Sequence, residues 1–231
     1  MTGGAALATA RDDQAGPELR AGPARFLADP SGVLWWPEEH TLFVADLHLE
    51  KGTSFARAGV LLPPFDTAAT LARLAEAVFR LAPARIVALG DSFHDAEGMA
   101  RLDDRDRAKL AGIAAGRHWI WLGGNHDPAS LTALDIGGVS FVHEAGPERH
   151  PEVSGHFHPK ASLRIHGRAV SCRCFVGDGT RLILPAFGAY AGGLDVREPA
   201  IAGLFPDGFT AHLLGRRRIT AVPSTMLGLA V

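Results

Sequence analysis

The chain has 231 residues and a formal net charge of −2. This length allows one domain with a full hydrophobic core, and the charge excludes a global basic field, so any nucleic-acid binding would need a local patch or bound metal ions. No run of 18 apolar residues and no basic segment followed by an apolar one is found, so we expect no membrane span, no signal peptide and a cytoplasmic location.

The amino-acid composition of the chain changes near residue 25. Residues 1–24 are rich in alanine and glycine without periodicity, and we expect them to be disordered, which leaves residues 25–231 as a single domain. Within that domain, 25–28 and 33–36 flank the run Asp29-Pro-Ser-Gly32, which predicts a β-hairpin.

Short apolar runs then alternate with helical patterns. Asp66 or Thr67 is the expected N-cap of the first helix. Strand–helix alternation at these lengths indicates right-handed crossovers and parallel pairing. We expect strands at 41–45, 85–89 and 119–122, and helices at 67–81 and 103–115.

After Asp127 the pattern becomes one of short strands joined by glycine turns, which predicts an antiparallel β region. The whole chain is therefore expected to form an αββα-type two-sheet sandwich, with helices outside and ligands gathered along one edge. The strands of this second region are expected near 139–141, 161–165, 169–176 and 181–184, with the last at 209–214.

The run Leu122-Gly-Gly-Asn125-His126-Asp127 ends a strand with side chains that can ligate or titrate. Taken alone, it is as typical of a polar turn as of a functional site. The interpretation as a site gains support because the same pattern recurs at Phe43-Val-Ala-Asp46-Leu-His48, Val87-Ala-Leu-Gly-Asp91, Ser140-Phe-Val-His143 and Ser154-Gly-His156-Phe-His158.

These strand ends carry carboxylates, imidazoles and one amide, with no thiolate. That donor set suits Mn²⁺, Fe²⁺ or Zn²⁺ better than Ca²⁺, and we favour Mn²⁺. The candidate ligands exceed what one ion needs, which predicts two ions bridged by a carboxylate, a site that can clamp a phosphoryl group. We expect each of the pairs 46/48 and 156/158 to share one face of an extended segment. The candidate ligands are Asp46, His48, Asp91, Asn125, His143, His156 and His158.

These motifs, in this order, resemble those of the calcineurin-like metallophosphoesterases. The resemblance is closer still to the bacterial ligase-associated DNA damage response endonucleases, and it runs from about Arg25 to the C-terminus. It is carried by 45–52 (Ala-Asp-Leu-His-Leu-Glu-Lys-Gly), 59–64 (Gly-Val-Leu-Leu-Pro-Pro), 89–95 (Leu-Gly-Asp-Ser-Phe-His-Asp), 155–159 (Gly-His-Phe-His-Pro) and 184–193 (Leu-Pro-Ala-Phe-Gly-Ala-Tyr-Ala-Gly-Gly).

The resemblance implies a role for each site residue. His126 would protonate the leaving oxygen, with Asp127 orienting it. Many relatives carry a carboxylate at the position of His94, which here is either near the phosphate or merely packed. One metal ion would be held by Asp46, His48, Asp91 and His158, and the other by Asp91, Asn125, His143 and His156.

The resemblance implies a two-metal phosphodiesterase that acts as a DNA endonuclease in repair. It also suggests an ATP-dependent DNA ligase, a DNA helicase and a metallo-β-lactamase-fold exonuclease as partners. Two alternatives stay open: the same chemistry on a small or cyclic nucleotide, and a non-catalytic scaffold that has lost its metals. The sequence does not indicate the oligomeric state or the preferred DNA strand form.

Overall fold

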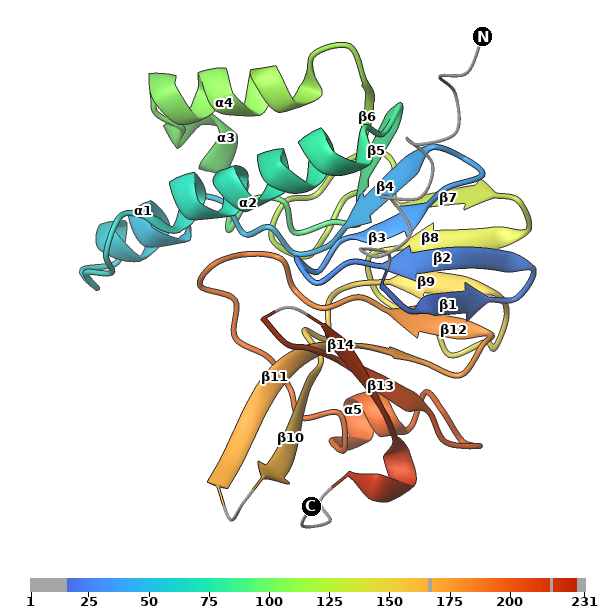
Figure 1. The fold of residues 1–231 in the computed structure, drawn as a ribbon. Helices are drawn as coiled ribbons and strands as arrows, with labels where there is room; N and C mark the ends of the chain where they lie inside the picture. Colours follow the sequence, from blue (N-terminus) through green and yellow to red (C-terminus); the bar gives the residue numbers. More distant parts are fainter. Residues whose placement is uncertain (1–15, 166–167, 217, 228–231) are drawn as a thin grey trace, which may run out of the picture.

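Two β-sheets pack face to face in the computed structural model, which describes residues 16–165, 168–216 and 218–227 (Figure 1). The first sheet has the order β1-β2-β3-β4-β5-β6. Its strands are β1 (Glu18–Ala21), β2 (Ala24–Ala28), β3 (Leu34–Trp36), β4 (Thr41–Val44), β5 (Arg85–Ala88) and β6 (His118–Trp121).

The second sheet has the order β14-β13-β11-β12-β9-β8-β7, and β10 pairs with β11 beside this path. Its strands are β7 (Ala133–Ile136), β8 (Val139–Val142), β9 (Glu152–Ser154), β10 (Lys160–Ile165), β11 (Arg168–Gly177), β12 (Arg181–Ile183), β13 (Thr210–Leu214) and β14 (Ile219–Pro223).

The helices lie on the outer faces of the sandwich (Figure 1). Within the described residues, no helix is both long and apolar enough to cross a membrane. The helices are α1 (Lys51–Arg57), α2 (Asp66–Leu81), α3 (Gly98–Arg101), α4 (Asp104–Ala114) and α5 (Pro199–Ala202), followed by a 3-10 turn at Ser224–Met226.

The predicted two-sheet α/β sandwich is confirmed. β4, β5 and β6 pair in parallel, with α2 crossing between the first two and α4 between the last two. The hairpin of β2 and β3 is also present. Because β4 and β5 are apolar on both faces, their side chains alternate between the core that faces the second sheet and the core under the helices.

The N-terminal boundary of the fold was predicted too late in the chain. Glu18–Ala21, expected to be disordered, forms β1 and pairs antiparallel with β2. Its alternation is too short to stand out in the sequence, yet Leu19 and Ala21 are buried in the core between the sheets. Residues 1–15 lie outside the described residues.

The second sheet is mixed rather than antiparallel, which corrects the prediction. β8–β9 and β9–β12 are parallel pairs. The sequence analysis also missed β7, β9 and the edge strand β14, together with helix α1. These elements have three to seven residues, so hydrophobic periodicity has too few positions to mark them.

The predicted cap of α2 is also wrong. Phe65 occupies the N-cap position, and its side chain makes no capping hydrogen bond. Asp66 instead accepts a hydrogen bond from the Gly52 backbone N–H at 3.1 Å. The Thr67 hydroxyl accepts one from the Glu50 N–H at 2.8 Å. Both side chains therefore tie α2 to the chain that follows β4, instead of closing the helix.

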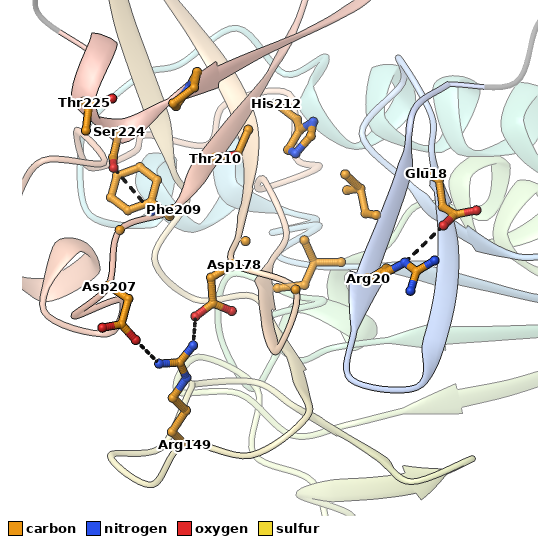
Figure 2. Close-up of a pocket in the computed structure, with 16 residues that line it drawn as sticks. Glu18, Arg20, Arg149, Asp178, Asp207, Phe209, Thr210, His212, Ser224 and Thr225 are labelled. Carbon is orange, nitrogen blue, oxygen red and sulfur yellow. Dashed lines mark hydrogen bonds and ion pairs between the residues drawn. The ribbon is translucent and has the colours of Figure 1, made fainter.

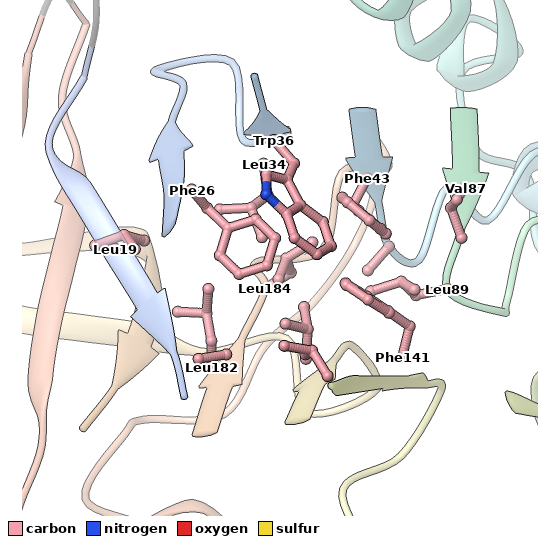
Figure 3. Packing of buried hydrophobic residues seen from close by; sticks show 14 of the residues in the cluster. Leu19, Phe26, Leu34, Trp36, Phe43, Val87, Leu89, Phe141, Leu182 and Leu184 are labelled. Atoms are coloured by element: carbon pink, nitrogen blue, oxygen red, sulfur yellow. The ribbon is translucent and has the colours of Figure 1, made fainter. Parts of the chain in front are cut away.

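Aromatic side chains fill the space between the sheets (Figure 3). Phe43 of the first sheet stacks on Phe141 of the second with ring centroids 4.3 Å apart. The rings of Phe26 and Trp36 lie 4.9 Å from each other and 6.0–6.4 Å from the rings of this pair. Each such aromatic pair contributes about 0.5–1.5 kcal/mol beyond its buried area, so this contact holds the two sheets in a fixed relation.

A buried ion pair joins neighbouring strands of the second sheet. Arg181 of β12 and Glu152 of β9 are register partners, with Nε and Oε1 3.0 Å apart and each side chain only 2% exposed. The Arg181 guanidinium also donates to the carbonyls of Gly146 and Glu148. Both Nη atoms of Arg181 are thus hydrogen-bonded to backbone carbonyls inside the protein.

We predict that Glu152→Ala lowers the free energy of unfolding by about 3–5 kcal/mol, because it leaves the Arg181 charge buried without its carboxylate. Urea denaturation measures this loss. The matched control is Glu18→Ala, which removes an exposed carboxylate paired with Arg20 and should cost no more than about 1 kcal/mol. Similar losses for both variants would contradict the prediction.

Candidate metal centre

The predicted ligands converge where the two sheets meet at one edge. Asp46 and His48 follow β4, and Asp91 follows β5. His143 follows β8 of the second sheet, and His156 and His158 follow β9. The first sheet thus contributes both carboxylates, while the second contributes most of the imidazoles.

The backbone is left-handed instead of extended at five of these residues. The φ angles are 54° at Asp46, 42° at His48, 47° at Asp91, 68° at His156 and 48° at His158. The expectation of two side chains on one face of an extended segment is therefore wrong. Each such conformation costs about 1–3 kcal/mol and persists only where surrounding contacts enforce it.

Hydrogen bonds between the loops enforce this backbone. The His48 N–H donates to the Asp91 carbonyl at 2.9 Å. The His156 N–H donates to the Asp46 carboxylate at 3.0 Å. These bonds join the loops after β4, β5 and β9 into one unit, so each ligand's position depends on the others.

One group of candidate donors comprises Asp46, His48 and His158, whose ligand atoms lie within 4.8 Å of one another. The Nε2 atoms of His48 and His158 are 3.2 Å apart. His158 Nε2 lies 3.5 Å from Asp46 Oδ1.

The second group comprises Asp91, His143 and His156, again within 4.8 Å. His143 Nε2 lies 3.5 Å from Asp91 Oδ2 and 3.1 Å from His156 Nδ1. Asp91 also connects the groups, because the same Oδ2 lies 3.9 Å from His48 Nε2. Its other oxygen, Oδ1, accepts the His126 backbone N–H at 2.9 Å.

These spacings fit metal coordination. Donors bound to one ion at about 2.1 Å lie about 3.0–3.4 Å apart in octahedral or tetrahedral geometry, close to the observed 3.1–3.5 Å. His143 is oriented for this role, because its Nδ1 is hydrogen-bonded to the Leu89 carbonyl at 2.9 Å. A ligating histidine is commonly held through its other nitrogen in this way.

The charges of the site also call for cations. Asp46 is fully buried and Asp91 is 3% exposed. Among the described residues neither forms an ion pair with lysine or arginine; their partners are histidines. Burial, with the nearby His158 and His126, lowers the pKa of His48 to about 2, so this imidazole is neutral, the form that binds metal. A buried carboxylate is stabilised by a nearby positive charge, which a metal ion bound at these donors would supply.

The motif at 125–127 lies beside this cluster. Asn125 is exposed, and it directly precedes His126, whose N–H is bound to Asp91. No hydrogen bond of the Asn125 side chain is found within the described part of the chain, so its place as a ligand stays a prediction. His126 itself is accessible, with its Nε2 3.9 Å from Asp91 Oδ2.

Asp127 does not orient His126, which corrects the role implied by the resemblance. Its carboxylate accepts the Phe93 N–H at 3.0 Å, and burial raises its pKa. The His126 Nδ1 is instead 2.8 Å from the carbonyl oxygen of His94. Asp127 thus holds the loop after β5 by binding the Phe93 N–H. The backbone carbonyl of His94 orients the His126 ring.

The His94 ring stacks on His126, with centroids 5.0 Å apart and planes 23° apart. On its other side it packs against Phe55 of α1 at 5.4 Å. Burial and the nearby charge of Lys51 lower the pKa of His94. His48, His94 and His126 also form a third group of possible ligand atoms within 4.8 Å of one another, which places His94 beside the candidate ligands; its role at a phosphate stays a prediction.

The sequence analysis missed the supports of the site. Glu50 is buried in a left-handed backbone and accepts hydrogen bonds from Thr53 and Thr67. On the other side, the Gly188 N–H donates to the Asp46 carbonyl at 2.9 Å. The segment at Phe187 and Gly188 is thus part of the wall of the site. The left-handed residue and the carbonyl partners carry no sequence signal of their own.

A cavity of about 560 Å³ lies apart from this cluster, between the β1 hairpin and strands β13 and β14 (Figure 2). Its wall holds none of the predicted site residues. Arg149 there is paired with both Asp178 and Asp207, and Arg20 with Glu18. Its charges are thus compensated by one another, in contrast to those of the metal centre.

Comparison with solved structures shows a likeness in fold. The chain is similar to the crystal structure of the nuclease MPE of Pseudomonas putida, with a TM-score of 0.67 and 22% identity over 89% of this chain and 99% of that one. At this identity the likeness shows a shared fold. No protein-family model and no curated protein matches this chain.

Two glycines allow the loops to approach each other. A Cβ on Gly124 would lie 2.1 Å from Asp91 Oδ1, and one on Gly155 would lie 2.8 Å from Asp46 Oδ2. Any side chain at these positions must displace a candidate metal ligand.

We predict that Gly124→Ala weakens Mn²⁺ binding roughly 10–100-fold, the usual effect of disturbing the support of a ligand. Titration calorimetry of the purified protein measures the affinity, and circular dichroism checks the fold. The control is Gly112→Ala in α4, where an added Cβ meets nothing within 4 Å. Unchanged Mn²⁺ affinity in Gly124→Ala would show that Asp91 does not bind the metal.

Proposed function

We propose that this protein is a metal-dependent phosphodiesterase that hydrolyses DNA with two divalent ions. The observation that carries the proposal is Asp91 Oδ2, which lies 3.5 Å from a nitrogen of one donor group and 3.9 Å from a nitrogen of the other. A carboxylate shared between two clusters of nitrogen and oxygen donors is typical of paired metal ions.

The proposed ligands divide between two ions. When bound, the ions neutralise phosphate charge and activate water for attack on phosphorus. The chain's part is to hold the donors and to orient the proton donor. Asp46, His48, Asp91 and His158 would hold one ion, and Asp91, Asn125, His143 and His156 the other, with Mn²⁺ favoured over Fe²⁺ and Zn²⁺.

His126 is the proposed general acid. Its Nδ1 lies 2.8 Å from the His94 carbonyl oxygen, which can only accept a hydrogen bond, so Nδ1 carries the hydrogen. When the ring is also protonated at Nε2, that nitrogen, which lies 3.9 Å from Asp91 Oδ2 on an accessible side chain, can donate to a leaving sugar oxygen. The stacked ring of His94 keeps His126 in this orientation.

Two findings support DNA as the substrate. The sequence motifs resemble those of DNA endonucleases, and the structural neighbour is described as a nuclease. The repair setting and the ligase, helicase and exonuclease partners rest on the resemblance alone. The deciding experiment compares single-stranded DNA, bis-p-nitrophenyl phosphate and 2′,3′-cyclic AMP as substrates, with Mn²⁺ and after chelation. Turnover of the cyclic nucleotide without DNA cleavage would favour the small-substrate alternative.

We predict that Asp91→Ala loses bound metal and lowers turnover by at least about 10²-fold, because the shared carboxylate serves both ions. Metal content by mass spectrometry and DNA cleavage are measured on the same sample. Asp135→Ala, which removes an exposed carboxylate on β7, serves as the control. Full activity of Asp91→Ala with two ions bound would rule out the shared ligand.

We predict that His126→Ala keeps its metal and loses roughly 10²–10⁴-fold of its activity on DNA, the usual contribution of a general acid. The loss should be much smaller on bis-p-nitrophenyl phosphate, because nitrophenolate leaves without protonation. The ratio of the two losses is the measurement. Equal losses, or a variant without metal, would assign His126 a different role.

A further inference from the structure

We propose that the β10–β11 hairpin binds the sugar–phosphate backbone of a polynucleotide that extends beyond the metal centre. The inference rests on the proposed function and identifies a surface that would select long substrates over small phosphodiesters. It starts from charge. Between Glu152 and Asp178 the sequence has no acidic residue, whereas it holds Lys160, Arg164, Arg168 and Arg173 in a chain with a net charge of −2.

The hairpin begins at the metal centre. β10 starts two residues after His158, a candidate ligand, and the hairpin runs away from the sandwich (Figure 1). The paired part of β10 covers Lys160–Ile165, so at about 3.4 Å per residue it extends roughly 17 Å. That length is comparable to about five phosphate steps along one strand of a duplex.

The register gives the hairpin two different faces. Lys160 pairs with Arg173, and Ser162 with Ser171, which places these four side chains on one face. The alternate positions include Ala161, Cys172 and Cys174, which pack into the core around α5 and β13. Near the base of the hairpin this face is thus apolar and covered, whereas its outer positions, Val170 and Arg168, are exposed. The opposite face carries cations and hydroxyls, both of which bind phosphate oxygens.

The cations of this face lack acidic partners. Lys160 and Arg173 stand directly opposite each other, an arrangement of like charges that destabilises a sheet. Neither forms an ion pair among the described residues. Arg173 donates to the Ala186 carbonyl at 2.8 Å, and Arg73 of α2 donates to the next carbonyl, that of Phe187. Burial, together with the charge of Arg173, lowers the pKa of Arg73 to about 10.

A bound polyanion would relieve this repulsion. Arg73 and Arg173 bind the carbonyls of Phe187 and Ala186. The N–H groups of Phe187 and Gly188 in turn donate to the carbonyls of Ala45 and Asp46. The positive charge of the two arginines therefore lies next to the wall of the metal centre. A small phosphodiester held by the metal ions would not reach the outer part of the hairpin. A polynucleotide would engage both.

The test places a carboxylate on the cationic face. Ser171→Glu uses an exposed position opposite Ser162. We expect it to weaken binding of a fluorescent single-stranded oligonucleotide about tenfold. The plot of log K against log salt has a negative slope, and its magnitude should decrease by about 0.7 for each phosphate that the hairpin no longer neutralises. Binding is measured without Mn²⁺, so that the result does not depend on cleavage.

Two further variants keep the test decisive. Ser171→Arg should tighten binding, which an unfolded protein cannot do. Thr220→Glu adds the same charge at an exposed position on β14 and should bind like the wild type. Hydrolysis of bis-p-nitrophenyl phosphate should stay within about twofold of wild type in all three, because the metal centre is untouched.

The outcomes separate the two proposals. If the wild type binds no DNA, or if Ser171→Glu and Ser171→Arg both bind like the wild type, the hairpin does not contact nucleic acid. If the wild type binds through the hairpin but cleaves only the small ester with Mn²⁺, the hairpin assignment holds and the proposed nuclease activity falls.

Discussion

The structure depends on two buried carboxylates, Asp46 and Asp91, that have imidazoles but no lysine or arginine around them among the described residues. A buried negative charge without compensation is strongly unfavourable. In most proteins an arginine would supply the balance, but the arginines near this site, Arg73 and Arg173, bind backbone carbonyls. Bound cations are the compensation that we propose, since the His/Asp groups around these carboxylates have the spacing of metal ligands. The loops and hydrogen bonds of the site hold the two carboxylates in place.

Holding the two carboxylates in place requires a strained backbone at the site. The left-handed backbone at five of the candidate ligands is unfavourable by itself, and it is maintained because each loop donates hydrogen bonds to the next. The His156 N–H binds the Asp46 carboxylate, and the His126 N–H binds that of Asp91. The same bonds that enforce the backbone thus also satisfy the carboxylates, so strain and ligand position are coupled.

The sequence indicated the donors but not their arrangement. Strand ends rich in histidine and aspartate predicted which side chains meet, because parallel strands end at a common edge. The role of Asp127 was misassigned, since adjacency to His126 in the sequence says nothing of where either side chain points. Its carboxylate turns to the Phe93 N–H, while a backbone carbonyl of His94 takes its place. Every residue has a backbone carbonyl, so neither the composition of the sequence nor the spacing of its motifs could have identified the His94 carbonyl as the partner of His126.

The metal centre spans both sheets, and this makes the hydrophobic core part of the site. Asp46 and Asp91 belong to the first sheet, whereas His143, His156 and His158 belong to the second. The distance between the two donor groups is therefore set by how the sheets pack, through contacts such as the stacked rings of Phe43 and Phe141. Protein interiors are close-packed and yield little, so this aromatic layer can fix donor spacing more firmly than loops alone. On this view the large side chains between the sheets position the site as well as stabilising the fold.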